Sequence, residues 1–400
     1  MGSCDSNKPK IMKKLENMET QISTQIVVNK KMENKINVLK TQIKDLTEAN
    51  LVGLDNTGAN CYLNVILQSL SNTTKLTKYF FKNFQNNKNN NNNDKIICNE
   101  YYNVLKNLWD RKNDKQSFAA NSFKQALINE NPGINNYGLK DLLIYLLEGF
   151  HRELNEISGN NNFNMNNTKL NPQDNLDEQR MLNFFMNNFR AIFHSKISDL
   201  FYGTMKLKIK CHVCNHTMYN FQLFNLIDFP LHQVNQYCIN QRLKNGYYID
   251  NLNRNNSQNF IINLYDCFKY NENKELMNGN NQNFCCICNN NCDAFCSKKI
   301  YTLPNYLIIN LNRGQGNVNQ YKVNFPKKLN LLNFVEYQEV NTYFELYSVI
   351  SSSIYGNILA YCQNNIDKKW YKYNDSIVEP CNQKDEYLNC IPNLLFYQAL

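Results

Sequence analysis

The chain has 400 residues, 42% of them hydrophobic and 12% aromatic, which is enough to bury a substantial core in one large domain or two to three smaller ones. No apolar run approaches the ~20 residues that span a bilayer, and the first residues lack the apolar stretch of a secretory signal, which argues against a transmembrane or secreted protein. The net charge of +9 comes from basic residues scattered along the chain, which argues against nucleic acid as a partner. The 15 cysteines, several of them in pairs, favour free thiols and metal ligands over disulfides and therefore a reducing, intracellular compartment.

Residues 1–10 are polar and contain an acylation pattern. Gly2 followed by Ser6 fits the rule for N-myristoylation, and Cys4 is placed to take a palmitoyl group. Two acyl chains matter because one myristoyl chain holds a membrane only marginally, at about 10⁴ M⁻¹. The alternative is an accidental Met-Gly start. The pattern predicts a cytoplasmic protein that acylation attaches to the cytoplasmic face of a membrane.

Residues 11–48 show the spacing of a helical seam. Apolar residues recur three and four positions apart, and they are Ile11, Leu15, Met18, Ile22, Met32, Ile36, Leu39, Ile43 and Leu46. Gln25 and Asn29 occupy the missing places, and polar residues at such core positions typically fix register and oligomeric state. The seam predicts a coiled coil that joins the chain to a second copy or to another protein. A single amphipathic helix that packs on its own domain is the alternative.

Residues 51–400 are globular in composition, with helical patterns first and β-rich segments later. Residues 137–154 have a helical period, with leucines at 139, 142, 143, 146 and 147. Strands are predicted at 301–311, 343–350, 358–362, 369–373 and 394–397. Asn-rich stretches near 82–94, 159–175, 251–259 and 271–283 are predicted to be surface loops. This order indicates an α+β fold.

The most informative stretch runs from residue 53 to residue 70 and reads GLDNTGANCYLNVILQSL. It is a glycine-bearing loop followed by an amphipathic helix, whose N-terminus falls at Cys61. Unpaired backbone N–H groups and the positive end of the helix dipole favour a thiolate at that place. Asn56 lies five residues earlier, where its side chain can fold back and donate an N–H to the oxyanion of a tetrahedral intermediate.

This stretch resembles the cysteine box of the ubiquitin-specific proteases, papain-like cysteine deubiquitinases with the pattern G-L-x-N-x-G-[NA]-x-C-Y-x-N-x-x-L-Q. Further matches are the segments LIYLLEGFHREL at 143–154, ISDLFYG at 197–203, LPNYLIINLNR at 303–313 and LLFY at 394–397. The resemblance implies that residues 51–400 form a helical thumb, a β-rich palm and zinc-tipped fingers, with the fingers roughly at 203–229 and 260–312. It gives Cys61 the place of the nucleophile and Asn56 that of the oxyanion donor.

Two cysteine pairs indicate a structural zinc site. Cys211 with Cys214, and Cys285 with Cys288, place two thiols three positions apart, the spacing of a knuckle that binds one side of a tetrahedral ion. The same pairs tip the fingers in the resembling family. The competing thiols are Cys286, Cys292 and Cys296, and His212 or His216 could replace one thiol.

The family's catalytic histidine has no counterpart in this chain. The family pattern G-H-Y-x-A-Y corresponds here to GNILAY at 356–361, so Asn357 holds the place of the base. Positions 233–400 contain no histidine at all. Asn374 and Asp375, from the segment WYKYNDS, match the residues that follow the histidine in the family, and Asn374 has the place of the residue that orients it.

A carboxamide does not titrate near neutrality, so Asn357 can neither take the thiol proton nor protonate a leaving amine. The resemblance therefore implies a protein that recognises ubiquitin or a ubiquitin-like protein for deubiquitination by thiol-dependent isopeptide hydrolysis, with impaired or no activity. The alternative is a catalytically dead ubiquitin-binding scaffold, a pseudoenzyme that its coiled coil recruits. A nucleic-acid-binding role for the cysteine clusters would need a basic face beside them, which Asp293 and the Asn-rich context do not provide.

Overall fold

The structure is a computed structural model that describes residues 25, 29–33, 51–58, 60–85, 95–109, 116–155, 174–192, 194–245, 261–314, 321–337, 341–353, 356–381 and 385–400. The chain divides into two compact units, one of residues 1–50 with 109–114 and one of residues 51–108 with 115–400. In the first unit, residues 25 and 29–33 are helical. Gly2, Cys4 and the rest of the predicted coiled coil lie outside the described residues. In the part of the chain that the structure describes, no helix is both long and apolar enough to cross a membrane.

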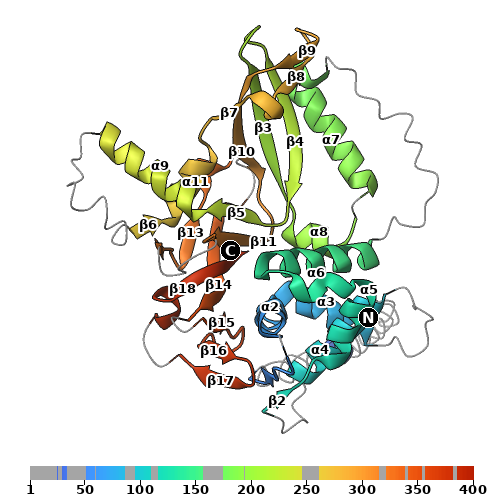
Figure 1. Ribbon diagram of the computed structural model, residues 1–400. Coiled ribbons are helices and arrows are strands. Elements are labelled where there is room, and N and C mark those ends of the chain that lie inside the picture. The colour runs from blue at the N-terminus through green and yellow to red at the C-terminus, as the bar shows by residue number, and fades with distance from the viewer. Residues whose placement is uncertain are drawn as a thin grey trace, which may run out of the picture. The chain divides into compact units, whose positions relative to one another are not determined.

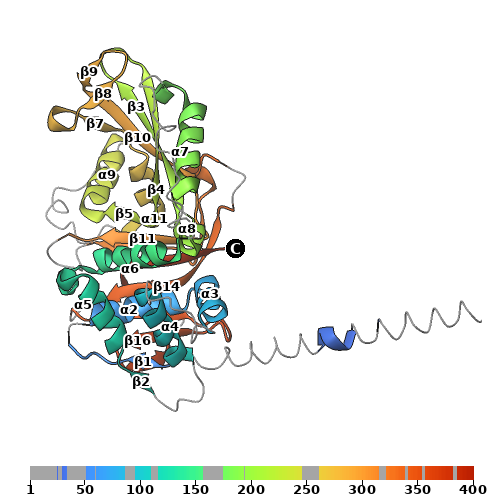
Figure 2. The ribbon, with the colours of Figure 1, turned by 90° about the vertical axis from the view of Figure 1, so that its right-hand side faces the viewer.

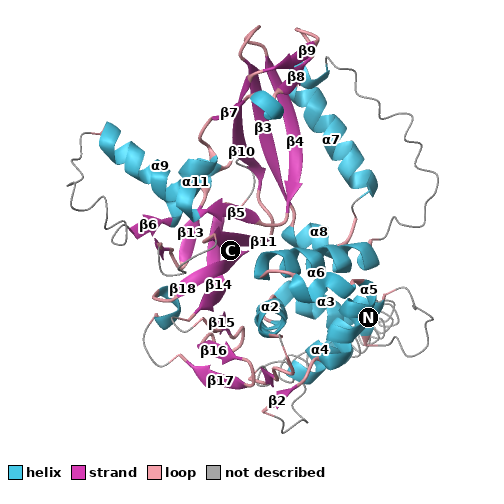
Figure 3. Ribbon diagram, in the orientation of Figure 1, coloured by secondary structure: helices cyan, strands magenta, loops and turns pink. Residues whose placement is uncertain are grey.

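Helices gather on one side of the second unit (Figure 3). They are α2 (Cys61–Ser71), α3 (Thr74–Phe84), α4 (Ile96–Trp109), α5 (Asn121–Glu130), α6 (Leu139–Leu154) and α8 (Lys196–Phe201). The helix predicted at 137–154 is confirmed as α6, which buries its apolar stripe. It begins two residues later than predicted because a 3-10 turn at Pro132–Asn136 precedes it and Gly138 is its extended N-cap.

An eight-stranded sheet faces these helices. Its order is β17-β16-β15-β14-β18-β11-β5, with β13 paired to β14. The strands are β5 (Ile227–Pro230), β11 (Tyr306–Asn312), β13 (Lys328–Asn330), β14 (Tyr343–Ser352), β15 (Ile358–Gln363), β16 (Trp370–Asn374), β17 (Ile377–Pro380) and β18 (Ile391–Ala399). All pairs are antiparallel except the parallel pair β11–β5. The strands predicted at 343–350, 358–362, 369–373 and 394–397 are thereby confirmed.

A second sheet of four strands projects from this body (Figures 1 and 2). Its order is β4-β3-β10-β7, with β3 (Gly203–Cys211), β4 (Thr217–Phe224), β7 (Glu275–Met277) and β10 (Ala294–Thr302). The hairpin of β8 (Asn283–Cys285) and β9 (Asn290–Cys292) lies at its tip, and α7 (Glu178–Ile192) runs beside β4. The ring centres of Phe185 on α7 and Phe221 on β4 are 6.0 Å apart.

Two predictions in this region are wrong in detail. The single strand predicted at 301–311 is two strands, β10 and β11, which belong to different sheets. Pro304 lies in the break, where its missing N–H removes a ladder hydrogen bond. The predicted loop at 271–283 contains β7, because Leu276 pairs with Phe295 and gives the edge of the sheet a partner.

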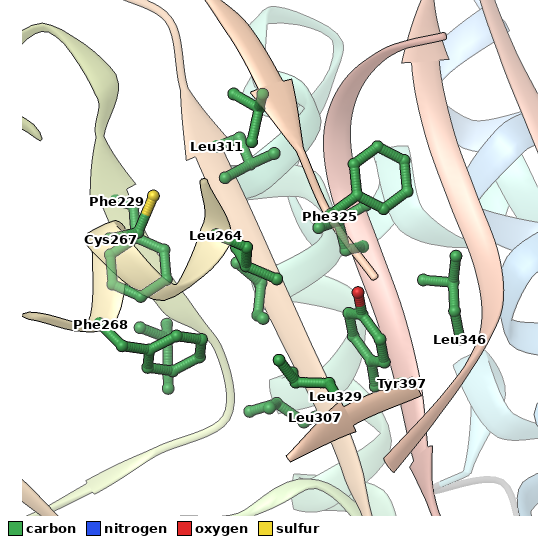
Figure 4. Close-up of a cluster of buried hydrophobic side chains, with 14 of the residues drawn as sticks. Phe229, Leu264, Cys267, Phe268, Leu307, Leu311, Phe325, Leu329, Leu346 and Tyr397 are labelled. Carbon is green, nitrogen blue, oxygen red and sulfur yellow. The ribbon is translucent and has the colours of Figure 1, made fainter. Parts of the chain in front are cut away.

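Short elements complete the unit. They are β1 (Gly53–Leu54) paired with β2 (Ser117–Phe118), β6 (Ile261–Asn263) paired with β12 (Lys322–Asn324), α9 (Leu231–Lys244) and α11 (Leu264–Asn271). One large apolar cluster lies between α9, α11 and the eight-stranded sheet (Figure 4). The ring of Phe268 lies 5.1 Å from that of Phe229 and 5.3 Å from that of Phe334. Burying one such side chain stabilises a fold by about 1.5–3 kcal/mol.

Helix α2 is the element that positions the candidate site. It packs on β14 and β15 on one side and on α6 on the other, and every residue from Leu63 to Ser71 is buried. Buried hydroxyls tie it to the sheet, because Ser69 Oγ lies 2.9 Å from Ser348 Oγ and Thr73 Oγ1 lies 2.8 Å from Tyr347 Oη. Only the N-terminal end of the helix therefore reaches the surface.

Candidate active site and metal centre

Cys61 is the first residue of α2 and is half-buried. The loop before it folds around the side chain of Asn56, whose Oδ1 accepts hydrogen bonds from the backbone N–H groups of Gly58 (3.2 Å) and Asn60 (3.3 Å). Gly58 has a φ of +115°, which L residues rarely adopt. The first turn of α2 carries no acidic side chain, and its leading N–H groups have no partner within a helix. The loop thus brings the Asn56 amide back to the helix N-terminus.

A carboxylate from the far end of the chain holds this loop. Asp375 lies in the tight turn between β16 and β17 with a φ of +50°. Its Oδ2 accepts a hydrogen bond from Asn56 Nδ2 at 3.0 Å, and its Oδ1 accepts one from Asn64 Nδ2 at 2.8 Å. Its backbone oxygen accepts the N–H of Leu54 at 2.9 Å. Asp375 therefore fixes Asn56, which still has a second amide N–H for an oxyanion.

Sequence reasoning did not single out Asn64, although the family pattern contains it. Its side chain is 2% exposed and bridges α2, the Leu54 carbonyl (3.1 Å) and Asp375. A buried amide needs hydrogen-bond partners, and this polar residue among the apolar residues 63, 65, 66 and 67 was the available signal. Asn64 links the loop before the nucleophile to the turn after β16.

One cavity of about 550 Å³ brings together all five side chains predicted for catalysis. Asn56 and Cys61 line it from the side of α2, and Asn357, Asn374 and Asp375 line it from the sheet. Tyr62 and Ile377, which are 40% and 54% exposed, add apolar surface. Within the part of the chain that the structure describes, no histidine lines the cavity.

Asn357 is the residue before β15, a strand that lies between β14 and β16, and it is exposed. Its backbone N–H donates to Ser353 Oγ at 3.1 Å, and its carbonyl accepts the N–H of Ser353. Asn357 and Asn374 also line a second cavity of about 860 Å³, and Arg313, Lys322 and Lys372 are among its other lining residues. Burial lowers the pKa of Arg313 to about 10.

Three of the histidines, His151, His212 and His232, lie away from the cavity that holds Cys61. His151 is buried on α6, where its Nδ1 lies 2.6 Å from Ser195 Oγ, and burial lowers its pKa. His232, on α9, has its Nδ1 2.8 Å from Tyr321 Oη. His212 precedes the fingertip turn, and its ring centre lies 5.8 Å from that of Phe295. None of these side chains borders the cavity that holds Cys61.

The two predicted cysteine knuckles meet at the tip of the four-stranded sheet. The sulfur atoms of Cys211, Cys214, Cys285 and Cys288 all lie within 4.8 Å of one another. Four thiolates around a tetrahedral zinc ion, with Zn–S bonds of about 2.3 Å, place their sulfurs ~3.8 Å apart, so the donor set fits this ion. Although burial acts to raise it, the pKa of Cys211 is lowered to about 6, because the backbone N–H groups of Cys214 and Val213 stabilise its thiolate.

The competing ligands are not part of this group. Cys286 directs its thiol to Asn175 Oδ1, 3.5 Å away. Cys292 and Cys296 share a small buried cluster with Cys211 and Cys285, but neither belongs to the group of four sulfurs. Neither His212 nor His216 belongs to the group of four sulfurs. The structure therefore brings together a four-cysteine cluster that is able to hold a metal ion.

Comparisons with known proteins give the fold a family. A sequence model described as "Ubiquitin carboxyl-terminal hydrolase" matches residues 52–397. Ubiquitin carboxyl-terminal hydrolase 2 of Bos taurus is 25% identical over 364 residues, which are 87% of this chain and 55% of that protein. Ubiquitin carboxyl-terminal hydrolase Usp2 of Drosophila melanogaster is 24% identical, over 89% of this chain and 35% of that protein. The chain thus spans about half of one relative and a third of the other.

Solved structures agree on the fold. The SAGA DUB module bound to monoubiquitin contains a chain that superposes with a TM-score of 0.61 at 18% identity, covering 88% of this chain and 70% of that one. The same module bound to ubiquitin aldehyde gives a TM-score of 0.59 at 18% identity, covering 89% of this chain and 70% of that one. The eight-stranded sheet with its helices corresponds to the palm and thumb, and the projecting four-stranded sheet corresponds to the fingers. With the family match across residues 52–397, the chain belongs to the ubiquitin carboxyl-terminal hydrolase family, as a member with the ubiquitin-specific protease fold.

Proposed function

We propose that this protein recognises ubiquitin through its palm and fingers and hydrolyses isopeptide bonds very slowly or not at all. One observation carries the proposal: Asn357 lines the same cavity as Cys61, and the described residues around that cavity include no histidine. General acid–base catalysis contributes about 10²–10⁴-fold to rate, and a carboxamide provides none of it. Membership of the family and the ubiquitin bound in related structures support ubiquitin as the partner.

The other parts of the site argue for a retained binding fold rather than a decayed one. Asn56 and Asn64 keep their hydrogen bonds to Asp375, and Cys61 keeps its place at the helix N-terminus. The proposed roles are nucleophile for Cys61, oxyanion donor for Asn56 and positioning of Asn56 for Asp375. Asn374 has lost the imidazole that it would orient.

The four-cysteine cluster is proposed to hold a structural zinc ion. Zinc there would join the β3–β4 turn to the β8–β9 hairpin, which share no ladder in the sheet order. It lies on the fingers, so it takes no part in chemistry at Cys61.

The N-terminal segment is proposed to recruit the protein. A coiled coil over residues 11–48 would pair with a second copy or another protein, and acyl groups on Gly2 and Cys4 would hold the protein at the cytoplasmic face of a membrane. Sedimentation of the full chain beside a variant lacking residues 11–48, and incorporation of labelled myristate into the wild type but not into Gly2→Ala, test these two proposals.

Calorimetric titration with ubiquitin and cleavage of lysine-linked diubiquitin, on the same samples, test the proposed function. The wild type, Cys61→Ala and Asn357→His are compared. We expect all three to bind ubiquitin, the wild type and Cys61→Ala to leave diubiquitin intact, and Asn357→His to gain cleavage. Cleavage by the wild type that disappears in Cys61→Ala would show that another base serves the thiol.

A further inference from the structure

We infer that Cys61 remains an acyl acceptor for thioesters, although it cannot cut isopeptides, and that the acyl group then stays on the protein. The inference rests on the proposed function, because the acyl donor is a C-terminal thioester of ubiquitin or of a ubiquitin-like protein. With Asn357 in the place of the histidine, the described residues of the cavity lack that acid and base but keep the nucleophile Cys61 and the oxyanion donor Asn56.

The two kinds of leaving group place different demands on the site. An isopeptide expels a lysine amine, whose conjugate acid has a pKa of about 10.4, so the nitrogen must be protonated as it departs. A thioester expels a thiolate, which is stable enough to leave without an acid. Asn357 stands in the place of the histidine that would be both base and proton donor. Without a donor the first reaction is blocked, whereas the second can start from the few per cent of a cysteine thiol that is ionised at pH 7 without a base.

The structure keeps the groups that the second reaction needs. Asn56 has both acceptor lone pairs engaged by Gly58 and Asn60 and one N–H engaged by Asp375, so the amide is fixed in orientation with its other N–H left for an oxyanion. Cys61 is only partly buried and opens into the 550 Å³ cavity. A fixed donor at the oxyanion typically contributes 10²–10³-fold to acyl transfer.

The step balances without a co-reactant other than the thioester. The Cys61 thiol loses its proton to solvent, and its sulfur lone pair forms a bond to the thioester carbonyl carbon. The π electrons move to the oxygen, which accepts the Asn56 N–H. Collapse breaks the carbon–sulfur bond of the donor, and its thiolate takes a proton from solvent. One thioester is exchanged for another, with the acyl group now on Cys61.

The new thioester persists because hydrolysis needs a base. Water is a poor nucleophile until a proton is removed from it, and none of the described residues that line the cavity replaces the missing imidazole. The Asp375 carboxylate already accepts hydrogen bonds from the amides of Asn56 and Asn64. Loss of general-base assistance slows deacylation by about 10²–10⁴-fold. The protein would therefore store the acyl group rather than release it.

The full-length, zinc-loaded protein is incubated with ubiquitin carrying a C-terminal mercaptoethanesulfonate thioester, and intact mass is followed with time. Cys61→Ala and Asn56→Ala test the site, and Cys381→Ala, which removes another half-buried thiol, is the matched control. Calorimetry with unmodified ubiquitin is run on every sample. We expect a hydroxylamine-sensitive adduct of one ubiquitin in the wild type and in Cys381→Ala, none in Cys61→Ala, and formation about 10²-fold slower in Asn56→Ala.

Other outcomes would refute the inference. Binding of ubiquitin without an adduct would overturn it and leave the proposed function standing, whereas absence of binding would overturn both. An adduct that survives in Cys61→Ala, or that forms equally fast in Asn56→Ala, would mean nonspecific thiol exchange. In Asn357→His the adduct should turn over instead of accumulating, and a stable adduct there would contradict the role given to the missing base.

Discussion

Gly53 lies against the backbone of Ser376 next to the candidate site, and alanine at this position should be severely destabilising. A Cβ added there would lie 2.2 Å from the carbonyl oxygen of Ser376 and 2.5 Å from its carbonyl carbon. Both atoms are backbone, so no side chain can rotate away. Ordinary contacts begin near 3.4 Å, and the two segments must therefore separate by about 1.2 Å.

The separation has a cost that can be assembled from the neighbouring bonds. Overpacking of this kind typically costs 1–3 kcal/mol. The hydrogen bond from Leu54 N–H to the Asp375 oxygen, 2.9 Å long, lies beside the contact, and its loss adds about 1 kcal/mol. Gly53→Ala should thus lower the free energy of unfolding by about 2–4 kcal/mol.

Urea unfolding followed by tryptophan fluorescence measures this loss. Gly133→Ala is the matched control, because its Cβ would meet only Asn131 Oδ1 at 3.4 Å and its φ is not positive. The control should stay within about 1 kcal/mol of the wild type. If Gly53→Ala unfolds at the same urea concentration as the control, the close approach of residues 53 and 376 is not what joins the loop to the sheet.

Three further predictions concern other parts of the molecule. Cys285→Ser should reduce bound zinc from about one equivalent per chain to none, measured by metal analysis after gel filtration; unchanged zinc would exclude Cys285 as a ligand. Phe268→Ala should cost about 3–5 kcal/mol in urea unfolding because the ring is 1% exposed, whereas Leu332→Ala, at a 41% exposed position, should cost under about 1 kcal/mol; equal costs would contradict the packing in Figure 4. Burial lowers the pKa of His151, so protons bind the unfolded chain more readily, and wild-type stability should fall as the pH drops below about 6.5. His151→Gln should flatten that fall between pH 7 and pH 5, and parallel curves would refute the assignment.

The parts of the site that were predictable from the sequence are those that a local pattern specifies. The loop and helix from residue 53 to residue 70 lie in one continuous stretch, so the placement of Cys61 at a helix N-terminus followed from glycine positions and a helical period. The metal cluster was predictable for a similar reason, because each knuckle is local and only their meeting depends on the fold.

The rest depends on long-range contacts that no local pattern encodes. Asp375 accepts a hydrogen bond from Asn64, which lies 311 positions earlier in the sequence, and no local pattern around either residue predicts this contact. The extended run at 301–311 has uniform strand character, yet tertiary pairing divides it between two sheets at Pro304. The Asn-rich segment at 271–283 looks like a loop in composition, and only its pairing with β10 makes part of it a strand.

Asn357 differs from its partners in how little of the fold depends on it. The side chains of Asn56 and Asp375 are hydrogen-bonded to each other at the junction between α2 and the sheet. Asn357 is exposed at the start of β15, and the hydrogen bonds that the structure gives for it are made by its backbone. A substitution of this exposed side chain therefore leaves the core untouched. Asparagine and histidine codons differ by a single nucleotide. A change of the Asn357 side chain thus alters the chemistry proposed for the cleft while the hydrogen bonds that join Asn56 and Asn64 to Asp375 stay in place.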